Sequence, residues 1–391
     1  MEQKQSAARA YTIAILAATF PFAFVNSVPS ILINEIIDTY SLTGASQGLV
    51  SSMLSLGVML ALIVTLLLQG RVKKTTMLVL SGLLQAVMLG VAVLAPVFGW
   101  FLFAMVLVGI GCGWLDSYVN SCMVDVQGPN SQKYLGILHG LFGVGSLIAP
   151  LAAAWILRRA DWRVASWAAS GVMLLAMALT WGIVRRMPES MNAVTKEKRL
   201  SLKDMRDYLK RGRNLLLLIC GAMTSMVQTG LLCWIVRYMT LEYQAAQLGA
   251  GCLTIYWVAA TINRFLAPKL HKKPLVLVVG GAVLSVVFLL IGLSVKNAVV
   301  MCVMVGLIGL STGHFMPMMV EECAQGYEGS TTLTTSVAML VMSIAKILIP
   351  LAMAAVTEAV SPAAGMLLPG IAGALSAIFG LWALKMKTQK A

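Results

Sequence analysis

The feature that most constrains this chain is its succession of apolar runs, each about twenty residues or longer, separated by short polar connections. A run of that length forms a helix able to cross a hydrocarbon core about 30 Å thick. Only 11% of the residues are charged and 59% are hydrophobic, which excludes a soluble globular domain. We expect twelve spans, at residues 10–35, 46–69, 75–96, 98–126, 133–157, 163–186, 213–239, 247–267, 274–295, 297–320, 330–356 and 363–385.

The net charge of +14 would suggest a nucleic-acid partner if the basic residues formed one surface. Most of them instead lie in the connections that face one side of the membrane when the N-terminus is cytoplasmic. Because basic loops stay on the cytoplasmic side, we predict a multi-pass protein of the cytoplasmic membrane, inner or plasma, with both termini inside. Its environment is the lipid bilayer, and no nucleic acid is expected to bind it.

The longest polar stretch, residues 187–212, divides the chain into two halves of six spans each, 1–186 and 213–391. Leu202, Met205 and Leu209 recur there at helical spacing among basic residues, which predicts a short amphipathic helix on the inner leaflet. A linker of this length cannot hold an enzyme domain. We therefore do not expect an enzyme.

The two halves share a weak pattern at a constant offset of about 200 residues, which is the signature of an internally duplicated transporter. The matched pairs are Gly109 with Gly309, Gly113 with Gly313, and Pro150 with Pro350.

Asp116 and Asn120 interrupt the apolar sequence of the fourth span. With Gly109 and Gly113 they are spaced by three and four residues, so a helix carries all four on one stripe. The glycines permit close approach of another helix. An unpaired charge at this depth costs about 2.5–3.5 kcal/mol or more, so an ionisable group here favours a wet, protein-lined cavity.

His139 lies in the fifth span, on one stripe with Gly143, Ser146 and Pro150. Intramembrane ionisable groups are functional-site candidates, and we assign Asp116 and His139 to proton coupling. The alternative is that both only hydrogen-bond neighbouring helices.

Lys346 lies near the centre of the eleventh span, too deep for its side chain to reach water along the helix, and it matches Ser146 at the 200-residue offset. A buried lysine is paired, deprotonated or in contact with an anion. Two roles stay open: a structural pair with Asp116 or another acid, or a part in substrate binding or coupling.

The first span contains Pro21 and Pro29 around Asn26. These prolines predict a broken or bent helix, tolerated beside protein or water, and Asn26 is a candidate substrate ligand. Glu35 and Asp38 follow where a solvated loop at the outer surface is expected.

The second half carries its own polar candidates. Gln228, Trp234 and His314 are assigned to substrate binding with Asn120 and Lys346, while Arg264 lies near the inner boundary, where it would snorkel or pair. The seven cysteines show no metal-binding spacing and are interpreted as small core residues.

Several segments resemble the major facilitator superfamily, and within it the branch of fucose and other sugar:proton symporters. LLLQGRVKKTTM is similar to the superfamily loop GxLaDrxGrkxxL, with Arg71 present and the acidic residue absent. The other matching segments are GCGWLDSYVN at 111–120, LHGLFGVGSLIAPL at 138–151, Trp234 and Tyr238, Asn263-Arg264, and residues 313–317.

The resemblance implies an all-α fold of two pseudo-symmetric six-helix bundles that rock about a central site, working as a monomer. It also implies that a membrane carboxylate carries the proton, here Asp116, and that Arg71 and Arg264 take part in gating. The chain departs from the branch in two places. Gln228 stands where a glutamate is common, and Lys346 stands in a span that is usually small and glycine-rich, which shifts the cavity toward anions.

Together these features predict a secondary transporter that takes up a small polar solute, a sugar or a sugar acid, by alternating access. A proton gradient would drive it, without cofactor or metal. Residues 145–154 are also similar to the antiporter motif GxxxGPxxGG, so a proton/solute antiporter or an organic-anion transporter remains an alternative. A sensor or an intramembrane enzyme is disfavoured, because no soluble partner domain and no demanding nucleophile or metal constellation is present.

Overall fold

The computed structural model describes residues 2–68, 72–128, 131–186, 202–270, 272–325 and 331–386. Within these residues the chain is helical, and eleven segments are long and apolar enough to cross a membrane. This confirms the all-α polytopic fold. The spanning helices are α1 (Glu2–Ile31), α3 (Ser46–Leu68), α4 (Lys74–Val93), α5 (Phe98–Gln127), α6 (Ser131–Leu157), α7 (Trp162–Val184), α9 (Gly212–Tyr243), α11 (Pro274–Val295), α12 (Ala298–Thr312) continued by α13 (Phe315–Gln325), α14 (Thr331–Ala359) and α15 (Pro362–Lys385).

The eighth expected span coincides with α10 (Ala246–Leu266), a helix of 21 residues. At 1.5 Å per residue it is about 30 Å long, enough to cross a hydrocarbon core. Gln247, Asn263 and Arg264 lower its mean hydropathy, so it is not among the eleven segments selected by composition.

The helices form two compact units. The first unit comprises Met1–Leu32 and Met53–Arg199, and the second comprises Ile33–Ser52 and Leu200–Ala391. The second unit thus includes a segment from early in the chain. The predicted domain limits, 1–186 and 213–391, stay a prediction.

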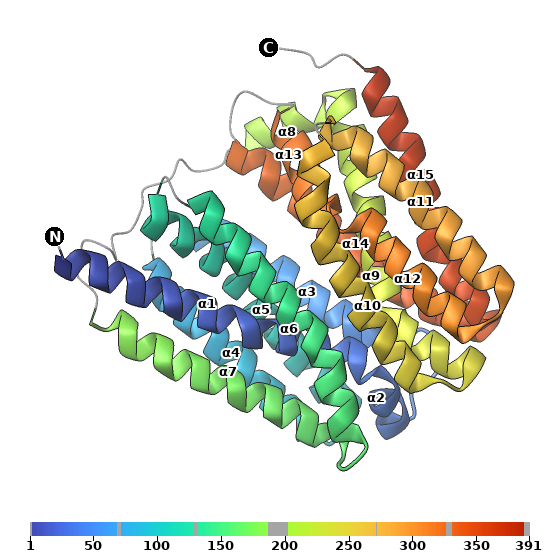
Figure 1. Ribbon diagram of the computed structural model, residues 1–391, viewed down its shortest axis with the longest axis horizontal. Coiled ribbons are helices and arrows are strands. Elements are labelled where there is room, and N and C mark those ends of the chain that lie inside the picture. The colour runs from blue at the N-terminus through green and yellow to red at the C-terminus, as the bar shows by residue number, and fades with distance from the viewer. Residues whose placement is uncertain are drawn as a thin grey trace. The chain divides into compact units, whose positions relative to one another are not determined.

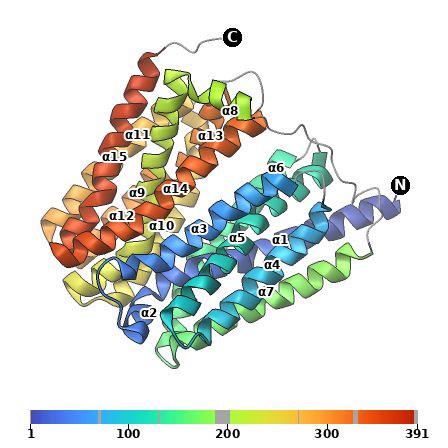
Figure 2. The same cartoon turned by 180° about the vertical axis from the view of Figure 1, so that it is seen from behind.

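In the first unit, α1, α4 and α7 lie side by side (Figure 2), and α4 packs along α5 while α1 packs along α6. In the second unit, α11 and α15 lie side by side (Figure 1), and the closest helix pairs are α9 with α15 and α10 with α12. Each unit therefore buries its own helix faces.

Local sequence signals set several helix ends. Asp161, Asn297 and Ser361 cap α7, α12 and α15 by accepting hydrogen bonds from first-turn N–H groups, and Pro274 begins α11. Capping side chains satisfy N–H groups that have no partner inside a helix, and proline suits a first turn because its missing N–H is not needed there.

The predicted break in the first span lies at Leu32 and not at either proline. α1 continues through Pro21 and Pro29 and is interrupted only at Leu32, after which α2 (Ile33–Tyr40) begins. Glu35 and Asp38 therefore lie on a helix and not in a loop. The buried face of α2 consists of Ile33, Asn34, Ile36 and Ile37.

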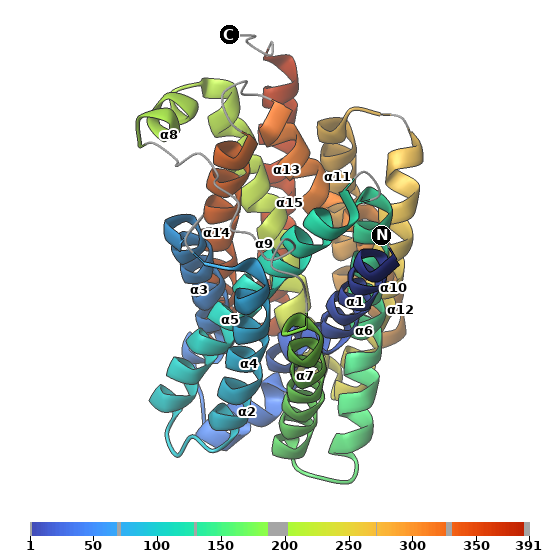
Figure 3. The ribbon, with the colours of Figure 1, turned by 90° about the vertical axis from the view of Figure 1, so that its left-hand side faces the viewer.

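The predicted amphipathic helix is α8 (Leu202–Leu209), which lies beside the start of α9 (Figure 3). Tyr208 on α8 is fully buried, and its backbone carbonyl accepts a hydrogen bond from Asn214 at 3.2 Å. Tyr208 therefore holds α8 against the helices of the second unit.

One interpretation of the cysteines is wrong. Cys252 on α10 and Cys302 on α12 are joined by a disulfide, a pairing across 50 residues that spacing could not reveal. The other five cysteines are buried, as expected for small core residues.

Candidate functional site

The polar stripe of the fourth span lies on α5 in the first unit. Gly109 and Gly113 contact α3 closely: an added Cβ at Gly109 would overlap the carbonyl oxygen of Leu54, and one at Gly113 would lie 2.8 Å from the Cβ of Ala61. The glycines thus permit close helix approach, as the spacing predicts.

Asp116 lies about one turn beyond Gly113 on α5, and Asn120 about two turns beyond it. The side-chain amide of Asn120 donates to the backbone carbonyl of Asp116 at 2.7 Å and reaches its carboxylate at 3.3 Å. Asp116 is exposed and Asn120 is half-buried. A carboxylate and an amide that share one polar position suit proton exchange or hydrogen bonding to a solute.

His139 lies on α6, and its side chain is exposed. An exposed apolar stripe follows the same helix through Ile137, Val144 and Leu151, and such a stripe is the lipid-facing side of a membrane helix. Residues two positions apart in a helix point in directions about 200° apart, so His139 lies opposite Ile137. The imidazole is accessible without facing lipid.

Lys346 occupies the middle of α14 and is half-buried. Ile344 and Leu348 are exposed on the same helix, and each is two residues from Lys346, which again places the lysine opposite the lipid-facing stripe. The next residue, Ile347, accepts a hydrogen bond from Ser52 at 2.7 Å through its carbonyl.

The tenth span is interrupted between α12 and α13. Pro317 has no N–H, so the carbonyl of Gly313 four residues earlier loses its helical partner. Arg264 of α10 replaces it, donating from Nε to the Gly313 oxygen at 3.0 Å. An added Cβ at Gly313 would overlap the carbonyl of Ala260, so glycine is needed for this approach. Arg264 is half-buried, and its side chain supplies the hydrogen bond that the interrupted helix lacks.

His314 lies at the interruption, with only 5% of its surface exposed. Its Nδ1 is 2.7 Å from the side-chain oxygen of Asn263, and the backbone of Leu277 on α11 also hydrogen-bonds the ring.

A second set of hydrogen bonds continues from this point toward α9. Gln228 donates to the Thr312 carbonyl at 2.8 Å, and the hydroxyls of Thr312 and Tyr256 are 3.2 Å apart. Discontinuous spans with polar partners are where membrane transporters place binding groups. Three of the predicted residues, Gln228, His314 and Arg264, therefore lie at or beside this interruption of the tenth span.

Beside this break, the second unit holds a cavity of about 340 Å³. Its polar lining consists of Arg264, Lys272, His314 and Glu321, and Pro317 and Met318 of α13 contribute apolar surface. The volume is at the lower end of the range of small-molecule sites.

The remaining predicted residues lie elsewhere. Trp234 is 1% exposed and its indole N–H donates to Thr357 at 3.0 Å, so no ring face is open for stacking in this conformation. Asn26 is half-buried on α1. Arg71 lies outside the described residues, so its predicted gating role has no structural description. The site roles of these residues stay predictions.

Sequence reasoning missed a polar cluster where α2 packs on α9. Asn34 donates to Thr240 at 2.8 Å and accepts from Arg237 at 3.4 Å. Among the described residues, one carboxylate oxygen of Glu35 is buried without a hydrogen-bond partner, and burial, with Asp38 nearby, raises the pKa of Glu35. The helical spacing of Ile33, Ile36 and Ile37 could have indicated α2.

Residues 15–328 match the model of the Major Facilitator Superfamily. Similar solved structures include a bacterial homologue of the human lysosomal transporter Spinster in an inward-facing and occupied conformation (TM-score 0.75, 15% identity, 97% of each chain covered). Others are the peptide transporter POT in complex with sulfate (TM-score 0.78, 13% identity, 97% of each chain) and the nucleoside transporter NupG (TM-score 0.77, 10% identity, 97% of this chain and 100% of that one). No curated protein matches the sequence.

Proposed function

Since the chain belongs to the Major Facilitator Superfamily and is a membrane transporter, we propose that it is a proton-coupled secondary transporter for the uptake of a small polar solute. A sugar acid fits best. Lys346 carries this proposal: a lysine in the middle of α14, opposite its lipid-facing stripe, is a group that an anionic solute can neutralise.

Asp116 and His139 are the proposed coupling groups. Both are ionisable and exposed in the first unit, so no cost of burial opposes the gain or loss of a proton. Asn120 would hold a solute hydroxyl or orient the Asp116 carboxylate. The proton gradient is the proposed driving force, and the monomer is the proposed functional form.

The solute class is tested by thermal-shift measurements on purified protein with neutral monosaccharides, small carboxylates and sugar acids. A bound solute stabilises the folded state by about 2.7 kcal/mol at a hundredfold excess over its Kd. We expect sugar acids to raise the Tm of the wild type but not of Lys346→Ala. Equal stabilisation of both proteins by neutral sugars would assign a neutral substrate and remove Lys346 from the site.

Coupling is tested in proteoliposomes with Asp116→Asn. We expect the variant to lose accumulation driven by a pH gradient while it still exchanges solute across the bilayer, because the amide retains the hydrogen bonds but not the proton. Unchanged gradient dependence would remove Asp116 from coupling. The sign of the gradient that drives uptake also separates symport from the antiport alternative.

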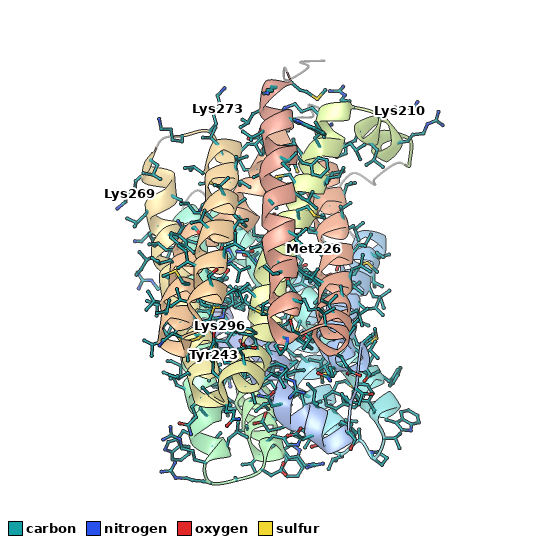
Figure 4. The ribbon with its side chains drawn as sticks, turned by 90° about the vertical axis from the view of Figure 1, so that its right-hand side faces the viewer. Lys210, Met226, Tyr243, Lys269, Lys273 and Lys296 are labelled. Atoms are coloured by element: carbon teal, nitrogen blue, oxygen red, sulfur yellow. A yellow bond between two sulfur atoms is a disulfide. The ribbon has the colours of Figure 1, made fainter. Side chains whose placement is uncertain are left out.

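We further propose that both termini are cytoplasmic. In the second unit Lys210, Lys269 and Lys273 lie at one end and Lys296 lies at the other (Figure 4), and cytoplasmic ends are the more basic. Reporter fusions that are active only inside or only outside the cell test this orientation at each terminus.

A further inference from the structure

We propose that the cavity bounded by Arg264, Lys272 and His314 is a binding site for a phosphate group, separate from the site at Lys346. The group is either a free small phosphate or the headgroup of an anionic lipid. The proposed function places the solute at Lys346 and the proton at Asp116 and His139, so the inference does not rest on it. It assigns His314 and Arg264, which the sequence placed in substrate binding and gating, to a separate site.

The charge of the lining favours an anion. Arg264 and Lys272 contribute two positive charges and Glu321 one negative charge, which leaves the cavity positive even with a neutral His314. Arg264 is half-buried, and guanidinium groups in that setting bind phosphate through paired N–H donors.

The bonding of Arg264 leaves its donors available. Within the described residues its one hydrogen bond is from Nε to the Gly313 carbonyl, and the guanidinium also lies over the ring of Trp257. The two terminal nitrogens are therefore free to meet an oxyanion, while the bond through Nε holds the planar group in place.

His314 forms part of the cavity wall beside Arg264. It is 5% exposed and lines the cavity. Its Nδ1 pairs with the side chain of Asn263, and the backbone of Leu277 on α11 also hydrogen-bonds the ring, so the imidazole is held in place in the cavity wall.

The N-terminus of α13 also favours an anion in the cavity. α13 starts at Phe315, directly after His314, and runs for 11 residues. The N-terminus of a helix carries a partial positive charge that stabilises phosphate. The cavity lining includes Pro317 and Met318 from this first turn.

The surroundings are compatible with both sources of phosphate. Phe265 and Leu266 are exposed on α10 next to Arg264, so the cavity adjoins lipid-facing surface. Lys269 and Lys273 lie at the same end of the second unit (Figure 4), and basic pockets near a membrane surface bind anionic headgroups.

The test uses Lys272→Gln, because Lys272 is exposed in a connection and its loss does not disturb packing. Lys273→Gln is the matched control: it removes the same charge from the adjacent exposed position, which is not part of the lining. The full-length protein in detergent is titrated with inorganic phosphate and with glycerol phosphate, and the protein in nanodiscs is compared with and without phosphatidylglycerol. Tm is the readout.

We expect phosphate to raise the Tm of wild type and Lys273→Gln, and the apparent affinity of Lys272→Gln to fall about tenfold, the usual effect of losing one charge-assisted contact. A response to soluble phosphates alone assigns a free anion, and a response to phosphatidylglycerol alone assigns a lipid headgroup. Lys346→Ala should keep the phosphate response whether or not it binds sugar acids. No response of the wild type, or equal weakening in the two glutamine variants, would overturn the proposal.

Discussion

The fourth and tenth spans start from the same pattern and reach different structures. In α5 the carbonyl of Gly113 keeps its main-chain partner and also accepts from the Ser117 hydroxyl at 2.9 Å. In the tenth span Pro317 stands at the matching position and provides no N–H, so Arg264 bonds the carbonyl of Gly313 instead. The residue four positions after the glycine therefore decides whether the glycine carbonyl keeps its main-chain partner or is bonded by an arginine from another helix.

In both spans a glycine permits close helix approach. We expect an added methyl group to be tolerated less well at Gly313 than at Gly113. A Cβ at Gly313 would overlap the Ala260 carbonyl, whereas at Gly113 it would lie 2.8 Å from the Ala61 Cβ. We expect Gly313→Ala to cost about 3 kcal/mol and Gly113→Ala about 1 kcal/mol, measured by reversible unfolding in detergent. Gly251→Ala, with open space around its Cβ, is the control and should cost nothing. Equal losses of stability at Gly113 and Gly313 would show that the two spans tolerate an added methyl group equally.

The next largest effect is expected for Arg264→Ala, which leaves the Gly313 carbonyl without its partner. The cost is about 2 kcal/mol. Pro317→Ala restores an N–H four residues after Gly313, so the same arginine substitution should cost less than half as much in that background. A double-mutant cycle on unfolding free energies measures this coupling. Strict additivity would show that Arg264 does not substitute for the helical hydrogen bond.

The smallest effect is expected for Ser117→Ala in α5. The Gly113 carbonyl keeps its main-chain hydrogen bond when the hydroxyl is lost, so we expect a cost of about 0.5 kcal/mol, again from unfolding free energies. A loss as large as that of Arg264→Ala would mean that α5 depends on its side-chain hydrogen bond and that the two spans are alike.

Local sequence patterns predicted much of the fold. The lengths of the apolar runs located the spanning helices, and helical spacing located α8. The close approach of Gly109 and Gly113 to another helix, and the position of Lys346 at mid-helix, also followed from spacing. These properties depend on residues a few positions apart, which is the range over which periodicity is informative.

The contacts between helices at and around the candidate site could be found only in the tertiary structure. The bond between Arg264 and Gly313 spans 49 residues, the disulfide of Cys252 and Cys302 spans 50, and Asn34 meets Thr240 across 206. No pattern within one helix specifies which residue of another helix will face it.

The sequence by itself therefore determined that this protein crosses a membrane as a bundle of helices, and which ionisable residues lie inside the spans. Only the tertiary structure decided that Arg264 donates a hydrogen bond at the interruption of the tenth span and that His314 lines a basic cavity beside it. The reason is physical: hydrophobicity and helical period act along the chain, whereas a partner for a freed carbonyl or a buried imidazole is supplied by whichever helix packs against it.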